Sequence, residues 1–399
     1  MNIDLILFFA FILVLFLLTI WKRKKLAIEK IAYPFIYIAL YRTKLGLNLM
    51  DRLAKKHLKF FDYFARIGVI IGFLAMIFIF VILFKGVYSF LFLGAQPPIA
   101  PLFPGVKIAG MPVMSFIHWI IVIFILASVH EFNHGLISRA YNIKVKSSGF
   151  AVFSFLLPII PAAFVEPDEE QLKKSKTKTQ LGVLAAGSYA NFITGGIFLL
   201  LFLFLLVPLS SSYVDETILV VESVEKNYPA ELAGIKAGDE IISVNNINVN
   251  DIEKLTFALS NLKPNDKINL QTTDKKYELK ASENPDNKSK GFIGINFENK
   301  INEKYNKNFV NFIFWLKLLV FWIFVANIGV GLFNLLPLGP LDGGRMFYVI
   351  ALHFFNEKKA KFLWIGISLI CLLLILISLS PFIIKLFSFI FSPFLSFIG

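Results

Sequence analysis

The sequence has few charged residues and almost no cysteine. Only 17% of its 399 residues are charged and 57% are hydrophobic, whereas soluble domains have roughly 25% charged and 45–50% apolar residues. The one cysteine, Cys371, lies in an apolar run, so no intramolecular disulfide can form. This composition excludes a disulfide-rich, collagen-like or disordered chain and indicates a membrane protein with a water-soluble part.

The apolar residues gather in runs that are long enough to cross a bilayer, which takes about 20 residues. The expected spans are residues 5–21, 67–84, 115–137, 181–209, 309–336 and 362–379. The apolar tail at 381–399 fits either a seventh span or an interfacial segment. We therefore expect an α-helical polytopic membrane protein with about six spans.

Two stretches depart from this helical pattern. Residues 147–165 are apolar but are interrupted by Gly149, Pro158 and Pro161, which predicts a membrane-embedded hairpin whose backbone is satisfied by protein or by a water-filled cavity. Residues 210–308 are polar and contain alternating strand-like runs and an amphipathic helix at 251–262. They predict one inserted α+β domain of about 90 residues.

Acidic residues are scarce outside this insertion. The chain has 40 basic and 27 acidic residues, a net charge of +13, but residues 213–307 carry 13 basic and 16 acidic residues. Residues 21–66 alone carry 12 basic and 3 acidic residues. By the positive-inside rule this segment is cytoplasmic, the N-terminus is outside and the insertion is extracytoplasmic. The excess charge is thus an orientation signal in a lipid bilayer, and we expect no nucleic-acid partner.

The third span ends in His130-Glu131-Phe132-Asn133-His134. Histidines four residues apart lie on one face of a helix, so both rings can bind one Zn²⁺ ion, and Glu131 is placed to accept a proton from the attacking water. The alternative is a pair of interior histidines that bond to their neighbours. An ionisable cluster in a span is costly and favours a functional site.

A catalytic zinc site needs a third protein ligand and an open position. Asp342 is the best candidate, because it follows an apolar span and precedes Gly343 and Gly344, which allow close backbone approach. Two alternatives remain. In another type of membrane metalloprotease the third ligand would be a glutamate, here from the Glu166–Glu170 cluster, and in a non-catalytic zinc-containing scaffold a fourth protein ligand would close the site.

Two amides lie in positions of interest. Asn334 precedes Asp342 across Pro337 and Pro340, where an amide can bond either an extended substrate or the broken helix end. Asn191 follows a small-residue stretch in the fourth span, where it can contact a substrate or make an interhelical hydrogen bond.

These motifs resemble the site-2 protease family of intramembrane zinc metalloproteases. The resemblance rests on residues 130–134, on Ala163-Phe-Val-Glu-Pro-Asp168, and on residues 334–343, in this order along residues 113–349. It implies that His130, His134 and Asp342 bind one catalytic Zn²⁺ and that Glu131 is the catalytic base. It also implies substrate-binding roles for Asn334 and Asn191. Residues 147–165 resemble the family's membrane re-entrant strands, which implies a membrane re-entrant β-hairpin whose open edge pairs with the substrate.

The insertion resembles a PDZ domain through residues 229–245 and the helix that follows. A PDZ groove binds a chain end or an extended segment, so a bound peptide is a possible partner.

Together these features predict an intramembrane metalloendopeptidase that hydrolyses single-span membrane proteins. Residues 1–66 form an anchor and a basic segment, 67–209 and 309–361 the two parts of the catalytic membrane domain, 210–308 the PDZ-like domain, and 362–399 the C-terminal membrane segment. The active site faces the cytoplasm, and the composition favours a prokaryotic cell membrane.

Overall fold

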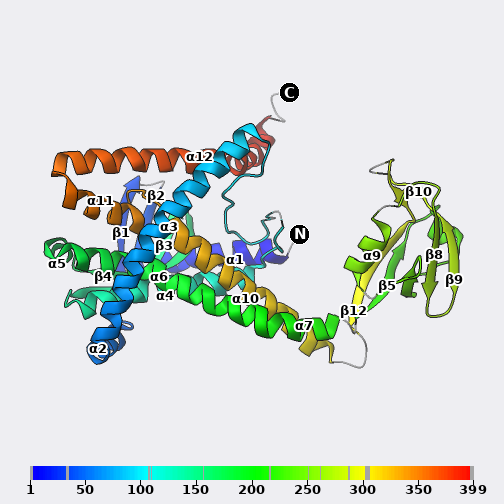
Figure 1. The fold of residues 1–399 in the computed structure, drawn as a ribbon, viewed down its shortest axis with the longest axis horizontal. Helices are drawn as coiled ribbons and strands as arrows, with labels where there is room; N and C mark the ends of the chain where they lie inside the picture. Colours follow the sequence, from blue (N-terminus) through cyan, green and yellow to red (C-terminus); the bar gives the residue numbers. More distant parts are fainter. Residues whose placement is uncertain are drawn as a thin grey trace. The chain divides into compact units, whose positions relative to one another are not determined.

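The computed structural model describes residues 3–395 except for a few short gaps (Figure 1). These gaps, together with the two ends of the chain, are residues 1–2, 33–35, 107, 109, 156, 215–216, 250, 261, 286–287, 302–305 and 396–399. The chain divides into two compact units. We call Met1–Leu199 with Leu318–Gly399 the membrane unit, and Leu200–Lys317 the inserted unit.

The membrane unit is built mainly of helices. They are α1 (Ile3–Trp21), α2 (Leu47–Lys56), α3 (Leu58–Phe92), α4 (Phe116–Ala140), α5 (Glu169–Lys174), α6 (Thr177–Leu201), α10 (Lys307–Asn334), α11 (Asp342–Phe354) and α12 (Glu357–Leu395). Helices α6 and α10 extend into the inserted unit, where a π-helical stretch at Phe202–Leu206 and α7 (Val207–Val214) continue α6.

Five helical stretches of the described residues are long and apolar enough to cross a membrane. They are α3, α4, the continuous stretch from α6 to Tyr213, α10 and the part of α12 up to Lys385. Helix α1 is apolar but shorter, so the expectation of about six spans stays a prediction. Helix α12 runs unbroken into the expected apolar tail.

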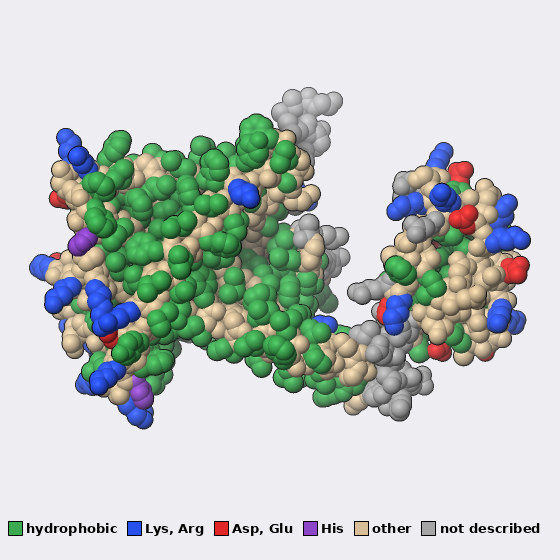
Figure 2. Space-filling model, viewed as in Figure 1, with side chains coloured by type: hydrophobic (Ala, Val, Ile, Leu, Met, Phe, Trp, Pro, Cys, Tyr) green, Lys and Arg blue, Asp and Glu red, His purple; other side chains and the backbone are tan. Residues whose placement is uncertain are grey.

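The surface of the membrane unit is strongly apolar. On α3, Ile70, Ile77 and Phe84 are all more than half exposed, as side chains that face lipid are. Figure 2 shows hydrophobic side chains over most of the visible face of this unit, with Lys and Arg gathered near α2 and α5. This arrangement fits an apolar belt with a basic rim on one side.

A four-stranded antiparallel sheet lies in the membrane unit. Its strands, in spatial order, are β1 (Leu26–Ala32), β2 (Ile36–Thr43), β3 (Val145–Phe155) and β4 (Leu157–Pro167). Strands β3 and β4 form the expected hairpin, and β4 is the terminal strand and packs along α4. The sequence did not predict β1 and β2 within the basic segment, although Ile and Tyr residues in them favour strands.

Buried side chains fix the helices around this sheet. One core cluster joins α2, α3, α4, β3, α5 and α6 through residues that include Met50, Ala65, Ile137, Val145 and Ala186. A second cluster joins α3 and α6 to α11 through Ala185, Leu335 and Met346. Helices α4, α6 and α11 are therefore held together by packing that does not depend on the polar groups between them.

The inserted unit is an α+β structure with its own core. It contains α8 (Pro229–Leu232) and α9 (Ile252–Leu259), with Asp251 as the N-cap of α9. Its strands are β5 (Thr217–Val224), β6 (Glu240–Val244), β7 (Ile247–Asn248), β8 (Lys267–Thr272), β9 (Lys276–Lys280), β10 (Ser282–Glu283), β11 (Gly291–Phe292) and β12 (Ile295–Ile301). The main sheet has the order β12-β5-β6-β8-β9. The described part of the expected helix at 251–262 is shorter than predicted, and Asn261 lies outside the described residues.

Candidate metal centre

Helices α4 and α11 bring three ligand atoms to one point in the membrane unit. The Nε2 atoms of His130 and His134 are 3.0 Å apart, and Asp342 Oδ2 lies 3.2 Å from the first and 3.1 Å from the second. Atoms bound to one tetrahedral Zn²⁺ at its usual bond lengths are about 3.3 Å apart. The three side chains therefore fit the face of one zinc coordination sphere.

The hydrogen bond behind the ring of His134 defines its tautomer. His134 Nδ1–H donates to the Val183 carbonyl at 2.7 Å, which leaves the Nε2 lone pair directed at Asp342. Three lone pairs that converge within about 3 Å repel one another unless a cation lies between them. This donor set suits a metal ion better than a structural histidine pair.

Asn191 lies behind the ring of His130 and is fully buried. Its amide nitrogen is 3.2 Å from His130 Nδ1, and its Oδ1 is without a hydrogen-bond partner among the described residues. Turning the amide by half a turn places Oδ1 where it accepts Nδ1–H, which pairs the oxygen and frees Nε2 for a metal. The sequence left open whether Asn191 contacts a substrate or makes an interhelical hydrogen bond, and in the structure its amide lies against a ring of the metal centre.

Glycines let the three helices come this close. Gly187 on α6 lies directly under both histidine rings, and a Cβ atom there would overlap His134 Nε2 and lie 2.8 Å from His130 Nε2. Gly343 and Gly344 in the first turn of α11 press against the Leu335 and Leu338 carbonyls, where a Cβ atom has no room. The Leu-Asp-Gly-Gly motif is thus a close backbone contact that seats Asp342 at the start of α11.

Glu131 lies beside the three ligands and is tied to the hairpin. Its Oε2 accepts a hydrogen bond from the Val165 backbone N–H of β4 at 3.0 Å. Glu131, Asn334 and the three ligands all line one cavity of about 730 Å³. This volume is within the range of pockets that bind small molecules or peptide segments.

The other acidic residues near the cavity are already paired. Glu166 Oε2 accepts hydrogen bonds from Ser147 Oγ at 2.6 Å and Arg42 Nε at 3.1 Å. The hydrogen bond from Ser147 has the largest effect on the pKa of Glu166. Together with the bond from Arg42 it lowers this pKa below its ordinary value, although partial burial acts in the opposite direction. Both carboxylate oxygens of Glu169 accept hydrogen bonds from one guanidinium nitrogen, Nη2, of Arg345 in α11. Neither glutamate belongs to the three-residue metal group found among the described residues.

The similarity to known proteins settles the family. The family model described as peptidase family M50 matches residues 118–376, which include all four residues of the centre. The chain belongs to peptidase family M50. This is the site-2 protease family that the motifs predicted, and the chain is accordingly a zinc metalloprotease of the membrane.

Two relatives cover much of the chain, and one of them is named as a zinc metalloprotease. An uncharacterized protein of Methanocaldococcus jannaschii is 30% identical over 332 residues, which cover 81% of this chain and 80% of that protein. The zinc metalloprotease RasP of Shouchella clausii is 25% identical over 292 residues, 58% of this chain and 68% of RasP. The M50 match extends across the inserted unit to α12.

Proposed function

We propose that this M50 peptidase hydrolyses peptide bonds within or near the transmembrane helices of single-span membrane proteins. The observation that carries the proposal is the convergence of His130, His134 and Asp342 beside Glu131 in a cavity of the apolar membrane unit. We assign the first three as ligands of one catalytic zinc ion and Glu131 as the base.

Zinc bound there would polarise the scissile carbonyl and acidify the attacking water. Glu131 accepts a proton from this water as the water oxygen bonds to the carbonyl carbon. When the carbon–nitrogen bond breaks, Glu131 returns the proton to the leaving nitrogen. Val165 N–H holds the carboxylate at a fixed place between these transfers.

A helical substrate hides its carbonyls, so it must be extended before attack. Strand β4 ends the sheet next to α4, and a terminal strand can pair with an extended peptide. Asn334 lines the same cavity from the end of α10, which supports a role in bonding the substrate backbone. Asn191 is fully buried against His130, and we propose that it positions this ring instead of touching substrate.

The distribution of basic residues supports an orientation in the membrane. Residues 21–66 carry the largest basic excess, and α2 and the surroundings of α5 show Lys and Arg on the face seen in Figure 2. On this basis we propose that the active site opens toward the cytoplasm, and the composition favours a prokaryotic cell. The inserted unit would then be an extracytoplasmic PDZ-like domain that binds a chain end or an extended peptide.

The two competing functions have less support. A closed structural site needs a fourth protein ligand, but the metal group found among the described residues has three. A glutamate ligand from the Glu166–Glu170 cluster would have to break its present contacts. Glu166 is bonded by Ser147 and Arg42. Glu169 is bonded by Arg345, and Glu170 lies near Lys174.

The test is a cleavage assay with candidate single-span proteins in detergent or vesicles. Glu131→Gln should keep zinc but lose about 10²–10⁴-fold in kcat, because it removes proton transfer and little volume. Zinc content measured for wild type, Asp342→Ala and Glu166→Ala identifies the third ligand. Normal turnover by Glu131→Gln would contradict the base assignment, and zinc loss only in Glu166→Ala would contradict the ligand assignment.

A further inference from the structure

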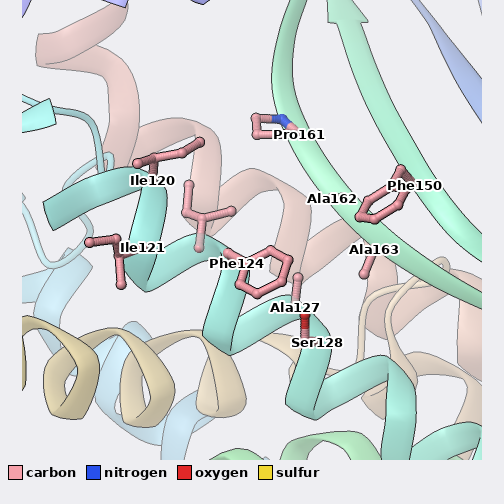
Figure 3. Close-up of a pocket in the computed structure, with 10 residues that line it drawn as sticks. Ile120, Ile121, Phe124, Ala127, Ser128, Phe150, Pro161, Ala162 and Ala163 are labelled. Carbon is pink, nitrogen blue, oxygen red and sulfur yellow. The ribbon is translucent and has the colours of Figure 1, made fainter. Parts of the chain in front are cut away.

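We propose that a second, apolar cavity between α4 and β4 is a specificity pocket that binds a large apolar side chain of the substrate near the scissile bond. The proposal rests on the proposed protease function. The cavity has a volume of about 300 Å³. Figure 3 shows its walls, formed by Ile120, Ile121, Phe124, Ala127 and Ser128 of α4, Phe150 of β3 and Pro161–Ala163 of β4.

The α4 residues that line this pocket lie on the same helix face as the proposed catalytic base, Glu131. Ile120, Phe124 and Ala127 follow one another at intervals of four and three residues, and Glu131 lies four residues beyond Ala127. Such positions share one face of a helix. The pocket is therefore the continuation, one turn toward the start of α4, of the face that carries Glu131.

Strand β4, which forms another wall of the pocket, also reaches the carboxylate of Glu131. Pro161, Ala163 and Val165 alternate along β4, and the Val165 N–H that bonds Glu131 points to the outer edge of the strand. Residues two apart in a strand have the same orientation, so the polar backbone groups of Ala163 face this edge as well. A peptide paired with β4 would pass the pocket immediately before or after it reaches Glu131.

The pocket and the catalytic cavity also share lining residues. Ala162 and Ala163 contribute to both. Ala163 is paired with Phe150 of β3, so their side chains lie on one face of the sheet. A substrate residue that pairs opposite Ala163 would extend its side chain from that face, toward the pocket.

The chemistry of the walls defines the class of side chain. Ser128 has the one polar side chain among the ten lining residues, and its neighbours are aliphatic or aromatic. Ala127, Ala162 and Ala163 leave the space open because they are small. Phe124 and Phe150 are 62% and 47% exposed and form the rim. We expect Leu, Ile, Met or Phe to bind there and charged or small side chains to bind poorly.

The first experiment locates the substrate residue. The substrate is a synthetic single-span peptide that the wild-type protein cleaves. A benzophenone amino acid is placed at each central position in turn, and each labelled peptide is irradiated together with the Glu131→Gln protein. One position, within a few residues of the cleaved bond, should crosslink to the α4 segment 120–128. Crosslinks that are equal at all positions, or that form with a photoreactive phospholipid instead of the peptide, would overturn the pocket's assignment to substrate.

The second experiment measures size preference at that position. A pocket that accommodates additional methylene groups discriminates between substrates by roughly 10–200-fold. The wild-type protein should therefore prefer Leu over Ala at this substrate position by about tenfold or more in kcat/KM. Ala127→Leu fills the pocket and should lower this Leu-to-Ala ratio about tenfold, whereas Phe124→Ala should shift the preference toward larger side chains.

The matched control is Ala10→Leu, the same enlargement at an exposed position of α1, which should keep the wild-type ratio. An unchanged ratio in both pocket variants refutes the pocket while wild-type cleavage still supports the protease. If wild type cleaves no faster than Glu131→Gln, the proposed function itself fails. A poorly folded Ala127→Leu protein leaves Phe124→Ala and the crosslinks to decide.

Discussion

Replacing Gly187 by alanine should weaken zinc binding without unfolding the protein. The added Cβ atom would overlap His134 Nε2 and crowd His130 Nε2 at 2.8 Å, so both rings must move from their present positions. Overpacking of this kind costs about 1–3 kcal/mol, and misdirected ligands lower metal affinity by about 10–100-fold. Helix propensity works in the opposite direction, because alanine is favoured over glycine by about 1 kcal/mol in a helix interior.

Gly196→Ala is the matched control on the same helix. A Cβ atom at Gly196 meets nothing within 4 Å, so this variant has the gain in propensity without the contact with the rings. Zinc affinity is measured by competition with a chromophoric chelator, and stability by thermal unfolding of the chelator-treated protein in detergent. Gly187→Ala should bind zinc about 10–100-fold more weakly than Gly196→Ala. Equal affinities would refute the close approach of Gly187 to the rings.

Two further predictions concern residues around the centre. Asn191→Leu removes the hydrogen-bond acceptor behind His130 and should lower zinc affinity about 10–100-fold. Asn191→Asp retains an acceptor and should keep most of the zinc affinity. Equal losses of affinity in the same chelator competition would exclude the acceptor role. The lowered pKa of Glu166 means that its ionised form stabilises the fold at neutral pH. Glu166→Gln should therefore be less stable than wild type near pH 7, and the difference should disappear as pH falls through the lowered pKa; a difference that persists in acid would point to packing instead.

The sequence could predict five of the apolar helices and the three residues that converge at the candidate metal centre, because these signals are local. Hydropathy alone indicates a span, and the spacing of His130 and His134 places both rings on one helix face. The Leu-Asp-Gly-Gly motif singled out Asp342 for the same reason, since Gly343 and Gly344 permit the contacts that the structure shows.

The features that could not be predicted depend on pairing between distant segments. Strands β1 and β2 lie in a segment dominated by basic residues, and β2 is stabilised by pairing with β3, which is more than 100 residues further along the chain. The ion pair of Arg42 with Glu166 spans 124 residues. The place of Gly187 under the histidines follows from how α6 crosses α4, and a small-residue stretch alone indicates only close packing.

The distance along the chain between the ligands has a consequence for biosynthesis. His134 and Asp342 are 208 residues apart, and the whole inserted unit lies between them. At about 5–20 residues per second, roughly 10–40 seconds of translation separate the two. During this time the histidines and Glu131 are already made, yet their third partner does not exist. A nascent or truncated chain therefore lacks the complete centre, so the order of the sequence itself delays proteolytic competence until the inserted unit has been synthesised.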